Sequence, residues 1–421
     1  MTQDEPFLEL DGSIDETAAR WRAKARAFAA EHAAPIGRRL DVMSAQEAVA
    51  SGSPYFDFLG AATAAGFLTM TAPAAYGGPG LSRLAEYLVV EELATGDAGL
   101  ATSLFIAPMA YRYAHDFGSP RLVEELSRPY FTGQRPEWSS CFAITDAGHG
   151  SDMMASHTPA FAVPGGDVIA RRDGDEWVLD GTKAAWTSNA MTATHALVCC
   201  TIDRTSLARG GIAVVPLDVD GVTRGRPLDK HGLRSLNQGS LSFSAVRLPA
   251  DHLLIGEDAY ATAMQATHAL ASVSMALLAF GTARAAYEGA LRWVRERVQG
   301  GRILSEHQAT QLRIFRMFGK LEAARALTRA VFLHNYGRTD AGGMGSLAHA
   351  AAAKVFVTEA AVEICGIAFQ LCGARATQRD GVRFTDGSVF YPEKLLRDAR
   401  SFMVADGEND LLSLLGAAHL L

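Results

Sequence analysis

The sequence has 421 residues, of which 48% are hydrophobic and 20% are charged, an ordinary composition for a globular protein with a large core. The length exceeds that of one typical domain, so two or three domains are expected. The formal net charge of -7 argues against a nucleic-acid-binding function, because that function needs a basic surface.

No targeting signal is expected at the start of the chain. Residues 1–10 are acidic and lack the basic start and apolar core of a signal peptide. An all-helical N-terminal domain is predicted for residues 1–137, because apolar residues recur at helical spacing in 18–33, 57–67 and 84–94.

A central β domain is predicted for residues 138–255. Short β-favouring segments, separated by Gly, Asp and Pro, occur at 177–179, 195–201, 211–216 and 241–248. No GxGxxG turn lies between a strand and a helix and no GxxxxGK[ST] motif occurs, so neither a Rossmann domain nor a P-loop is supported.

A C-terminal helical bundle is predicted for residues 256–421. Long helical patterns occupy 262–299, 306–336 and 346–372, and one or two helices follow from 395. The apolar stretch 266–283 contains polar residues such as Thr267 and His268, which favours a buried helix over a membrane span. The five cysteines include no CxxC pair, so we expect a cytoplasmic protein with neither disulfides nor a metal site.

Two segments of the β domain combine glycines with hydroxyl groups. Residues 144–152 read ITDAGHGSD, a turn in which glycines let backbone N–H groups approach a ligand and hydroxyls add further donors. About thirty residues later, 180–189 read DGTKAAWTSN. Either segment alone would be interpreted as an ordinary turn or an ordinary core strand.

These segments, with four further motifs in order, resemble the acyl-CoA dehydrogenase superfamily. The further motifs are PAAYGG at 73–78, AVRLP followed by LLIG at 245–256, Arg297 with Gln308, and QLCG at 370–373 followed by PEKLLRDAR at 392–400. The resemblance covers about residues 14–415. It implies an α+β multidomain fold with an N-terminal helical domain, a central β-barrel-like domain and a C-terminal four-helix bundle.

The resemblance also implies non-covalent FAD. The residues expected near the flavin ring are Thr145, Gly150, Ser151, Trp186, Thr187 and Ser188. The residues expected near the pyrophosphate and adenosine are Arg297, Gln308, Gln370 and Gly373, and an arginine suits a pyrophosphate because its planar fork makes charge-assisted hydrogen bonds. The family completes this site between chains, so a homotetramer or a dimer is expected.

Asp406 is the expected catalytic base. The family oxidises a substrate between Cα and Cβ, with a carboxylate taking the α-proton and flavin N5 accepting hydride, and the carboxylate directly precedes a glycine. An ungapped register from 397–400 places Asp406 and Gly407 there, although the family usually has Glu. Nitroalkane oxidases of the superfamily resemble this chain in using Asp. Glu408 is the second choice, and its alternative role is to cap the helix 409–415.

The substrate side departs from the dehydrogenase pattern. Arg234 lies in a Gly-x-Arg motif that leads to the substrate, and Gly407 adjoins the base. Farther along, Asn237 and Gly239 stand where acyl-CoA dehydrogenases carry the Asp and Arg of their CoA-contacting motif. The substrate handle is therefore CoA held differently, an acyl carrier protein, or, for another reaction, a small amine or nitro compound.

Three functions follow from the resemblance. The first is an acyl-thioester dehydrogenase that passes electrons to a separate electron-transfer flavoprotein, and we favour it on the breadth of the match. The second is an oxidase or monooxygenase on the same fold, and the third is a non-catalytic flavoprotein scaffold. The third fits least, because the chain is acidic and keeps a carboxylate at the base position. No membrane or nucleic-acid partner is expected.

Overall fold

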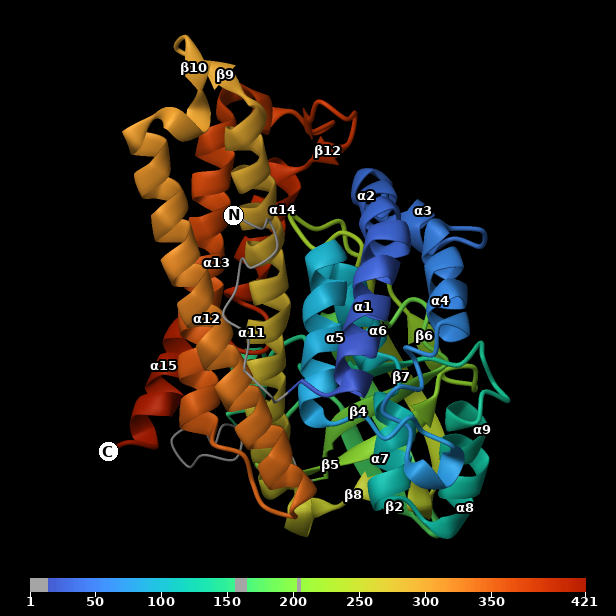
Figure 1. Ribbon diagram of the computed structural model, residues 1–421. Coiled ribbons are helices and arrows are strands. Elements are labelled where there is room, and N and C mark those ends of the chain that lie inside the picture. Colours follow the sequence, from blue (N-terminus) through green and yellow to red (C-terminus); the bar gives the residue numbers. More distant parts are fainter. Residues whose placement is uncertain (1–13, 156–164, 203–205) are drawn as a thin grey trace.

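The computed structural model describes residues 14–155, 165–202 and 206–421, so the acidic residues 1–10 lie outside the described part (Figure 1). Helices come first along the chain, then strands, then helices again. In Figure 1 the long helices of the C-terminal region stand side by side on the left, and the N-terminal helices and the sheet lie on the right. The predicted architecture is therefore confirmed, whereas the domain boundaries at 137 and 255 stay predictions.

The N-terminal region consists of short and medium helices. Their bounds are α1 (Glu16–Phe28), α2 (Ala34–Val42), α3 (Ala45–Val49), α4 (Pro54–Ala64), α5 (Arg83–Gly96), α6 (Ala98–Ile106), α7 (Met109–Phe117), α8 (Pro120–Leu122) and α9 (Arg128–Phe131). A π-helical turn at Ala29–Ala33 links α1 to α2. Side chains of Asp15, Ser53 and Ser82 cap α1, α4 and α5, which explains where these helices begin.

The central region is one eight-stranded sheet with the order β6-β7-β3-β2-β4-β5-β8, and β1 pairs with β4. The bounds are β1 (Ser140–Ala143), β2 (Ile169–Asp173), β3 (Glu176–Ser188), β4 (His195–Thr201), β5 (Gly210–Pro216), β6 (Val222–Arg224), β7 (Gln238–Pro249) and β8 (Leu253–Ile255). The β1–β4 and β2–β4 pairs are parallel and the others antiparallel. The short helix α10 (Ser151–Met154) follows β1 and carries Ser151.

The C-terminal region is built on three long helices that pack against one another. The bounds are α11 (Glu257–Glu296), α12 (Gln308–Asp340), α13 (Leu347–Cys372), α14 (Pro392–Phe402) and α15 (Asn409–Ala418), with the small hairpins β9–β10 (Val298–Gln299, Arg302–Ile303) and β11–β12 (Val382–Arg383, Val389–Phe390). By length and composition alone, α11 and the stretch Leu347–Thr377, which begins with α13, could cross a membrane. Inside the protein, 83% of the apolar window of α11 and 44% of the window of the second stretch are buried.

Candidate active site

A buried ion pair fastens the glycine-rich turn to β3. The Lys183 ammonium lies 2.5 Å from the Asp146 carboxylate and donates to the Ile144 carbonyl oxygen at 2.8 Å, and neither charged side chain reaches solvent. Beside this pair, the Ala184 N–H donates to the Thr145 carbonyl oxygen at 2.9 Å. The two segments predicted to flank the flavin ring therefore form one rigid corner.

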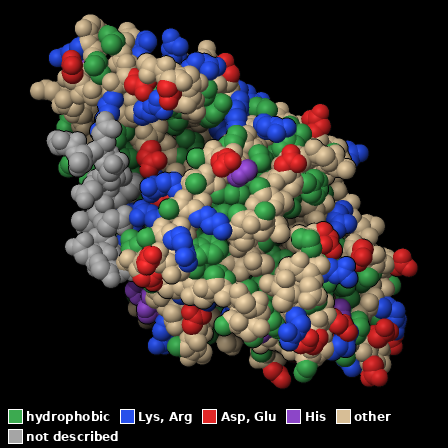
Figure 2. Space-filling model, turned by 45° about the vertical axis from the view of Figure 1, so that its right-hand side comes forward, with side chains coloured by type: hydrophobic (Ala, Val, Ile, Leu, Met, Phe, Trp, Pro, Cys, Tyr) green, Lys and Arg blue, Asp and Glu red, His purple; other side chains and the backbone are tan. Residues whose placement is uncertain are grey.

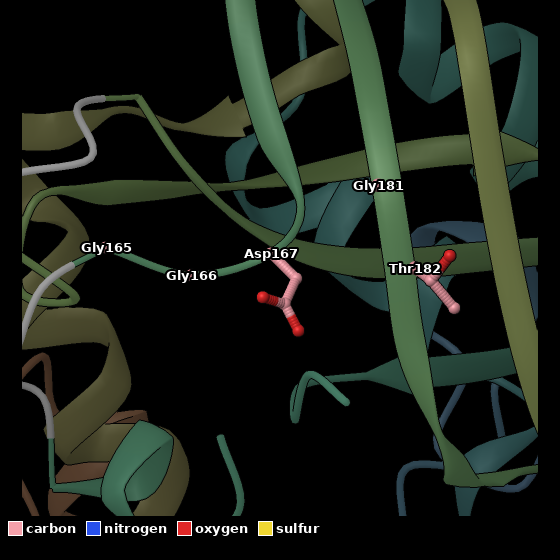
Figure 3. Close-up of a pocket in the computed structure, with 5 residues that line it drawn as sticks. All are labelled: Gly165, Gly166, Asp167, Gly181 and Thr182. Carbon is pink, nitrogen blue, oxygen red and sulfur yellow. The ribbon is translucent and has the colours of Figure 1, made fainter. Parts of the chain in front are cut away.

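Asp167 braces the same turn from the other side. Its carboxylate accepts a hydrogen bond from the Gly148 N–H at 3.0 Å, and its own N–H donates to Asp146 at 2.7 Å. Figure 3 shows Asp167 between the Gly165–Gly166 segment and the strand that carries Gly181, where these residues line a pocket of about 340 Å³. Gly181 has a φ of 125°, and a Cβ there would lie 2.1 Å from the Asp167 carbonyl oxygen, so only glycine fits.

A bulge in β3 separates a buried lysine from an exposed tryptophan. In the pairing with β7, Lys183 faces Leu241 and Thr187 faces Gly239, so β3 holds extra residues between these two pairs. Lys183 is completely buried there, whereas 65% of Trp186 is exposed. An exposed indole beside hydroxyl groups offers a planar apolar face with polar neighbours, and this donor set suits the ring and polar edge of a flavin. The residues present therefore fit FAD.

The segment that carries Asp406 contacts Ser151 at the end of the glycine-rich turn, although more than 250 residues separate the two in sequence. The contact is made by Ser151, whose hydroxyl accepts a hydrogen bond from the Glu408 N–H at 3.3 Å. Burial raises the pKa of Asp406, and the Lys354 ammonium acts in the opposite direction. The Glu408 carboxylate accepts from Asp410 N–H at 2.9 Å and Leu411 N–H at 3.2 Å, so the capping interpretation of Glu408 is confirmed.

Sequence analysis missed Lys354 on α13. Its ammonium donates to the backbone on both sides of Asp406, at Met403 and at Gly407. The sequence does contain a signal, because Lys354 is a lone charge within the apolar run AAAAKVFV, and a buried charge needs a partner. The pattern does not name that partner.

The predicted substrate residues are engaged within the chain. The Arg234 guanidinium donates to the carbonyl oxygens of Asp41 and Met43 at 2.8 and 3.0 Å, which ties the β-domain loop to the end of α2. The Asn237 side chain bonds Met191 N–H at 3.2 Å and the Thr192 hydroxyl at 3.1 Å. Contacts of Arg234, Asn237 and Gly407 with substrate stay predictions.

The predicted adenosine residues gather at the other end of the bundle. Arg297 follows α11, Gln308 begins α12, and Gln370 and Gly373 end α13. A hydrogen bond of 3.2 Å from the Trp293 indole to the Leu371 carbonyl oxygen joins two of these ends. Along α13, about 24 Å separates Gln370 from Lys354 at ~1.5 Å per residue.

No group of three His, Cys, Asp or Glu side chains that could hold a metal ion occurs within residues 14–155, 165–202 and 206–421. The five cysteines are buried and unpaired. On the face shown in Figure 2, basic and acidic side chains are interspersed rather than gathered by sign.

Comparison with known proteins identifies relatives along nearly the whole chain. Residues 15–134, 141–246 and 261–421 match the N-terminal, middle and C-terminal domains of acyl-CoA dehydrogenases. The mitochondrial short-chain specific acyl-CoA dehydrogenase of Homo sapiens is 32% identical over 367 residues, which are 85% of this chain and 80% of the human protein.

Solved structures share the fold. Butyryl-CoA dehydrogenase from Megasphaera elsdenii superposes with a TM-score of 0.83 at 22% identity, covering 98% of this chain and 100% of that one. The prolyl acyl carrier protein oxidase AnaB superposes with a TM-score of 0.79 at 22% identity, covering 96% and 99%. At these identities the two structures confirm the predicted fold and carry no further conclusion.

Proposed function

This chain belongs to the acyl-CoA dehydrogenase family, and from that premise we propose that it oxidises an acyl thioester between Cα and Cβ with Asp406 as the base. It is an FAD-dependent oxidoreductase, as members of this family are. The observation that carries the proposal is the contact between the Asp406 segment and Ser151 of the glycine-rich turn. This contact supports the proposal that the Asp406 carboxylate faces the corner that fits the flavin.

Different residues of the chain have different roles in the proposed reaction. Asp406 takes the α-proton, and its raised pKa makes it a stronger base than an ordinary carboxylate. The paired Lys183 and Asp146 hold the turn, so the hydroxyls of Thr145 and Ser151 keep their positions. Trp186 presents its ring at the same corner. FAD held by these residues would supply the acceptor for the hydride that leaves Cβ.

The group that carries the acyl thioester is the part of the substrate for which this chain departs from the acyl-CoA dehydrogenase pattern. At Gly239, a Cβ would lie 2.3 Å from the Met191 methyl carbon, so Met191 fills the space that a side chain would need. An arginine does not fit there unless Met191 moves. We therefore extend the proposal to a thioester presented by an acyl carrier protein, with the CoA ester as the alternative.

The setting of the enzyme belongs to the same proposal. It works in the cytoplasm as a homotetramer, a second copy completes the adenosine end of each FAD site, and an electron-transfer flavoprotein reoxidises the flavin. The unpaired buried cysteines support an intracellular setting. The exposed positions of Gln308 and Gln370 support the completion of the site by another chain.

An anaerobic titration tests the proposed function. Short acyl-CoA esters and the matching acyl carrier protein thioesters are added to the FAD-loaded protein, and the loss of flavin absorbance is followed. We expect one thioester series to bleach the flavin stoichiometrically. Bleaching by a nitroalkane or an amine alone would overturn the dehydrogenase proposal. Rapid return of colour on admitting oxygen, without an added acceptor, would assign the oxidase function instead.

A further inference from the structure

Lys354 is a cation that the interior of the protein surrounds completely. It lies on α13, and its side chain has no exposed surface. Its ammonium donates to the Met403 carbonyl oxygen at 3.0 Å, to the Gly407 carbonyl oxygen at 2.6 Å and to the Asn409 side-chain oxygen at 2.8 Å. An ammonium has three donors, so these three bonds use all of them.

The three acceptors belong to one short segment, residues 403–409, which comprises the connection from α14 to α15 and the first residue of α15. Asp406 lies in the middle of this segment, with acceptors before and after it. Asp406 has a φ of 50° and Gly407 a φ of 104°, so two consecutive residues adopt left-handed backbone. Such a conformation costs free energy at a residue other than glycine and persists only where the surroundings hold it.

The charges around this segment act on one another. The groups whose charge acts on Lys354 are Asp406 and Glu408, and the group whose charge acts on Asp406 is Lys354. Burial lowers the pKa of Lys354 to about 8, and both carboxylates oppose that change. Burial raises the pKa of Asp406, and Lys354 opposes that change. Each group therefore helps the other to stay charged.

We propose that Lys354 is the positioning residue for Asp406: its three hydrogen bonds hold the left-handed segment in place and keep a buried cation against the turn that carries the Asp406 carboxylate. The inference rests on the proposed function, in which Asp406 is the base. Lys354 itself touches neither substrate nor flavin in this account. It acts through the backbone at Met403 and Gly407.

Two substitutions of Lys354 separate its bonds from its charge. Lys354→Met keeps the length of the side chain and removes both, whereas Lys354→Arg keeps the charge and changes the hydrogen-bond geometry. We expect flavin reduction to slow about tenfold to a hundredfold in Lys354→Met, the range for a base misplaced by about 1 Å. As pH is lowered, flavin reduction by this variant should also be lost at a higher pH than in the parent, because Asp406 protonates more readily without the cation. In Lys354→Arg, the rate of flavin reduction should fall at the same acidic pH as in the parent.

Asn335→Ala is the matched structural control. Asn335 is equally buried and bonds Ala269 and Ser346 across the helical bundle, away from the 403–409 segment. This substitution should lower the melting temperature and leave the pH profile of flavin reduction unchanged. Should Lys354→Met not fold, Asn409→Ala takes its place, since it removes one of the three acceptors. We expect that variant to reduce flavin more slowly, and an unchanged rate would overturn the proposal.

An infrared titration measures the effect of Lys354 on the protonation of Asp406 without catalytic turnover. In FAD-loaded protein labelled at aspartate, the Asp406 carboxylate band is assigned by its loss in Asp406→Asn and followed with pH. We expect a higher midpoint in Lys354→Met than in the parent and in Lys354→Arg. Equal midpoints in all three would overturn the inference. A parent protein whose flavin no thioester reduces would count against the proposed function alone, and the infrared midpoints would still decide the role of Lys354.

Discussion

The side chain at the base position is shorter than the family's usual Glu, and the backbone gives a physical reason to accept Asp. Asp406 adopts a φ of 50°, and Asp and Asn tolerate this left-handed region better than most residues. A Glu would extend the carboxylate by one methylene but would hold this backbone less readily. The left-handed turn therefore favours Asp over Glu at this position.

This backbone makes Asp406→Asn a clean test of the base, because Asn keeps the shape and the left-handed conformation while losing the charge. We expect flavin reduction to fall about a hundredfold to ten-thousandfold, the usual effect of removing a general base. The FAD content should stay that of the parent. Asp406→Glu should retain part of the rate with an ordinary acyl thioester. If Asp406→Asn reduced as fast as the parent, the base would lie elsewhere, and Glu408 would be tested next.

For single residues, the sequence predicts which side chains are candidates for a role better than it predicts which groups surround them. The register from Arg397 points to Asp406, and the N-cap role of Glu408 follows from its place before a helix. The partners of Lys354 are not predictable, because they lie on a segment about fifty residues later whose path depends on how α14 and α15 pack. Arg234 shows the same limit, since the carbonyl oxygens that it binds belong to another domain.

Among the elements, long helices are predicted well and short ones poorly. The pattern 262–299 corresponds to α11, and 346–372 to α13, because their apolar residues repeat over many turns. The short helices from α6 to α9 have too few turns for such a repeat. The sequence also does not predict the parallel β1–β4 pair. Its two strands lie about fifty residues apart, and the residue pattern of one strand does not identify the strand with which it pairs.

One buried carboxylate on α5 makes ionic contacts with both α1 and α11. Glu92 on α5 accepts hydrogen bonds from Arg22 at 3.0 Å and from Arg26 at 2.8 Å, both on α1, and lies 3.1 Å from Arg284 on α11. Burial alone would raise the pKa of Glu92, but the bonds from Arg26 and the charge of Arg284 outweigh it and lower the pKa to about 2. A lowered carboxylate pKa stabilises the fold above the unfolded value of 4.5, and this stabilisation is lost as pH falls toward 2.

Glu92→Gln should therefore destabilise the protein in a pH-dependent way. The shift corresponds to about 3 kcal/mol at neutral pH. We expect the melting temperature of the variant to lie well below that of the parent at pH 6, and the gap to narrow as pH falls through 4 to 3. Glu124→Gln is the control, because Glu124 bonds Arg128 on the surface and should change little. A gap that stays constant over this pH range would show that the charge of Glu92 is not its source.

Over the whole molecule, the helical bundle leaves an apolar face uncovered. On α12, Leu312 and Phe315 are 60% and 72% exposed. Gln308, Leu312 and Phe315 follow one another at spacings of four and three residues, so they share one side of α12. A second copy covering this side would lie against Gln308, a predicted adenosine contact. The proposals on assembly and on FAD binding are thereby linked through one surface.

Phe315→Lys tests this link. Burying a phenylalanine at an interface stabilises association by about 1.5–3 kcal/mol, so losing it should weaken self-association about tenfold to a hundredfold. We expect a smaller species in sedimentation velocity at micromolar concentration and less FAD retained per chain after gel filtration. Phe117→Lys is the matched control, since Phe117 is 53% exposed on α7, in the N-terminal region, and should change neither property. A Phe315→Lys protein that kept the parent's size would rule out this side of α12 as the interface. One that became smaller yet kept its FAD would place the adenosine end of the site within a single chain.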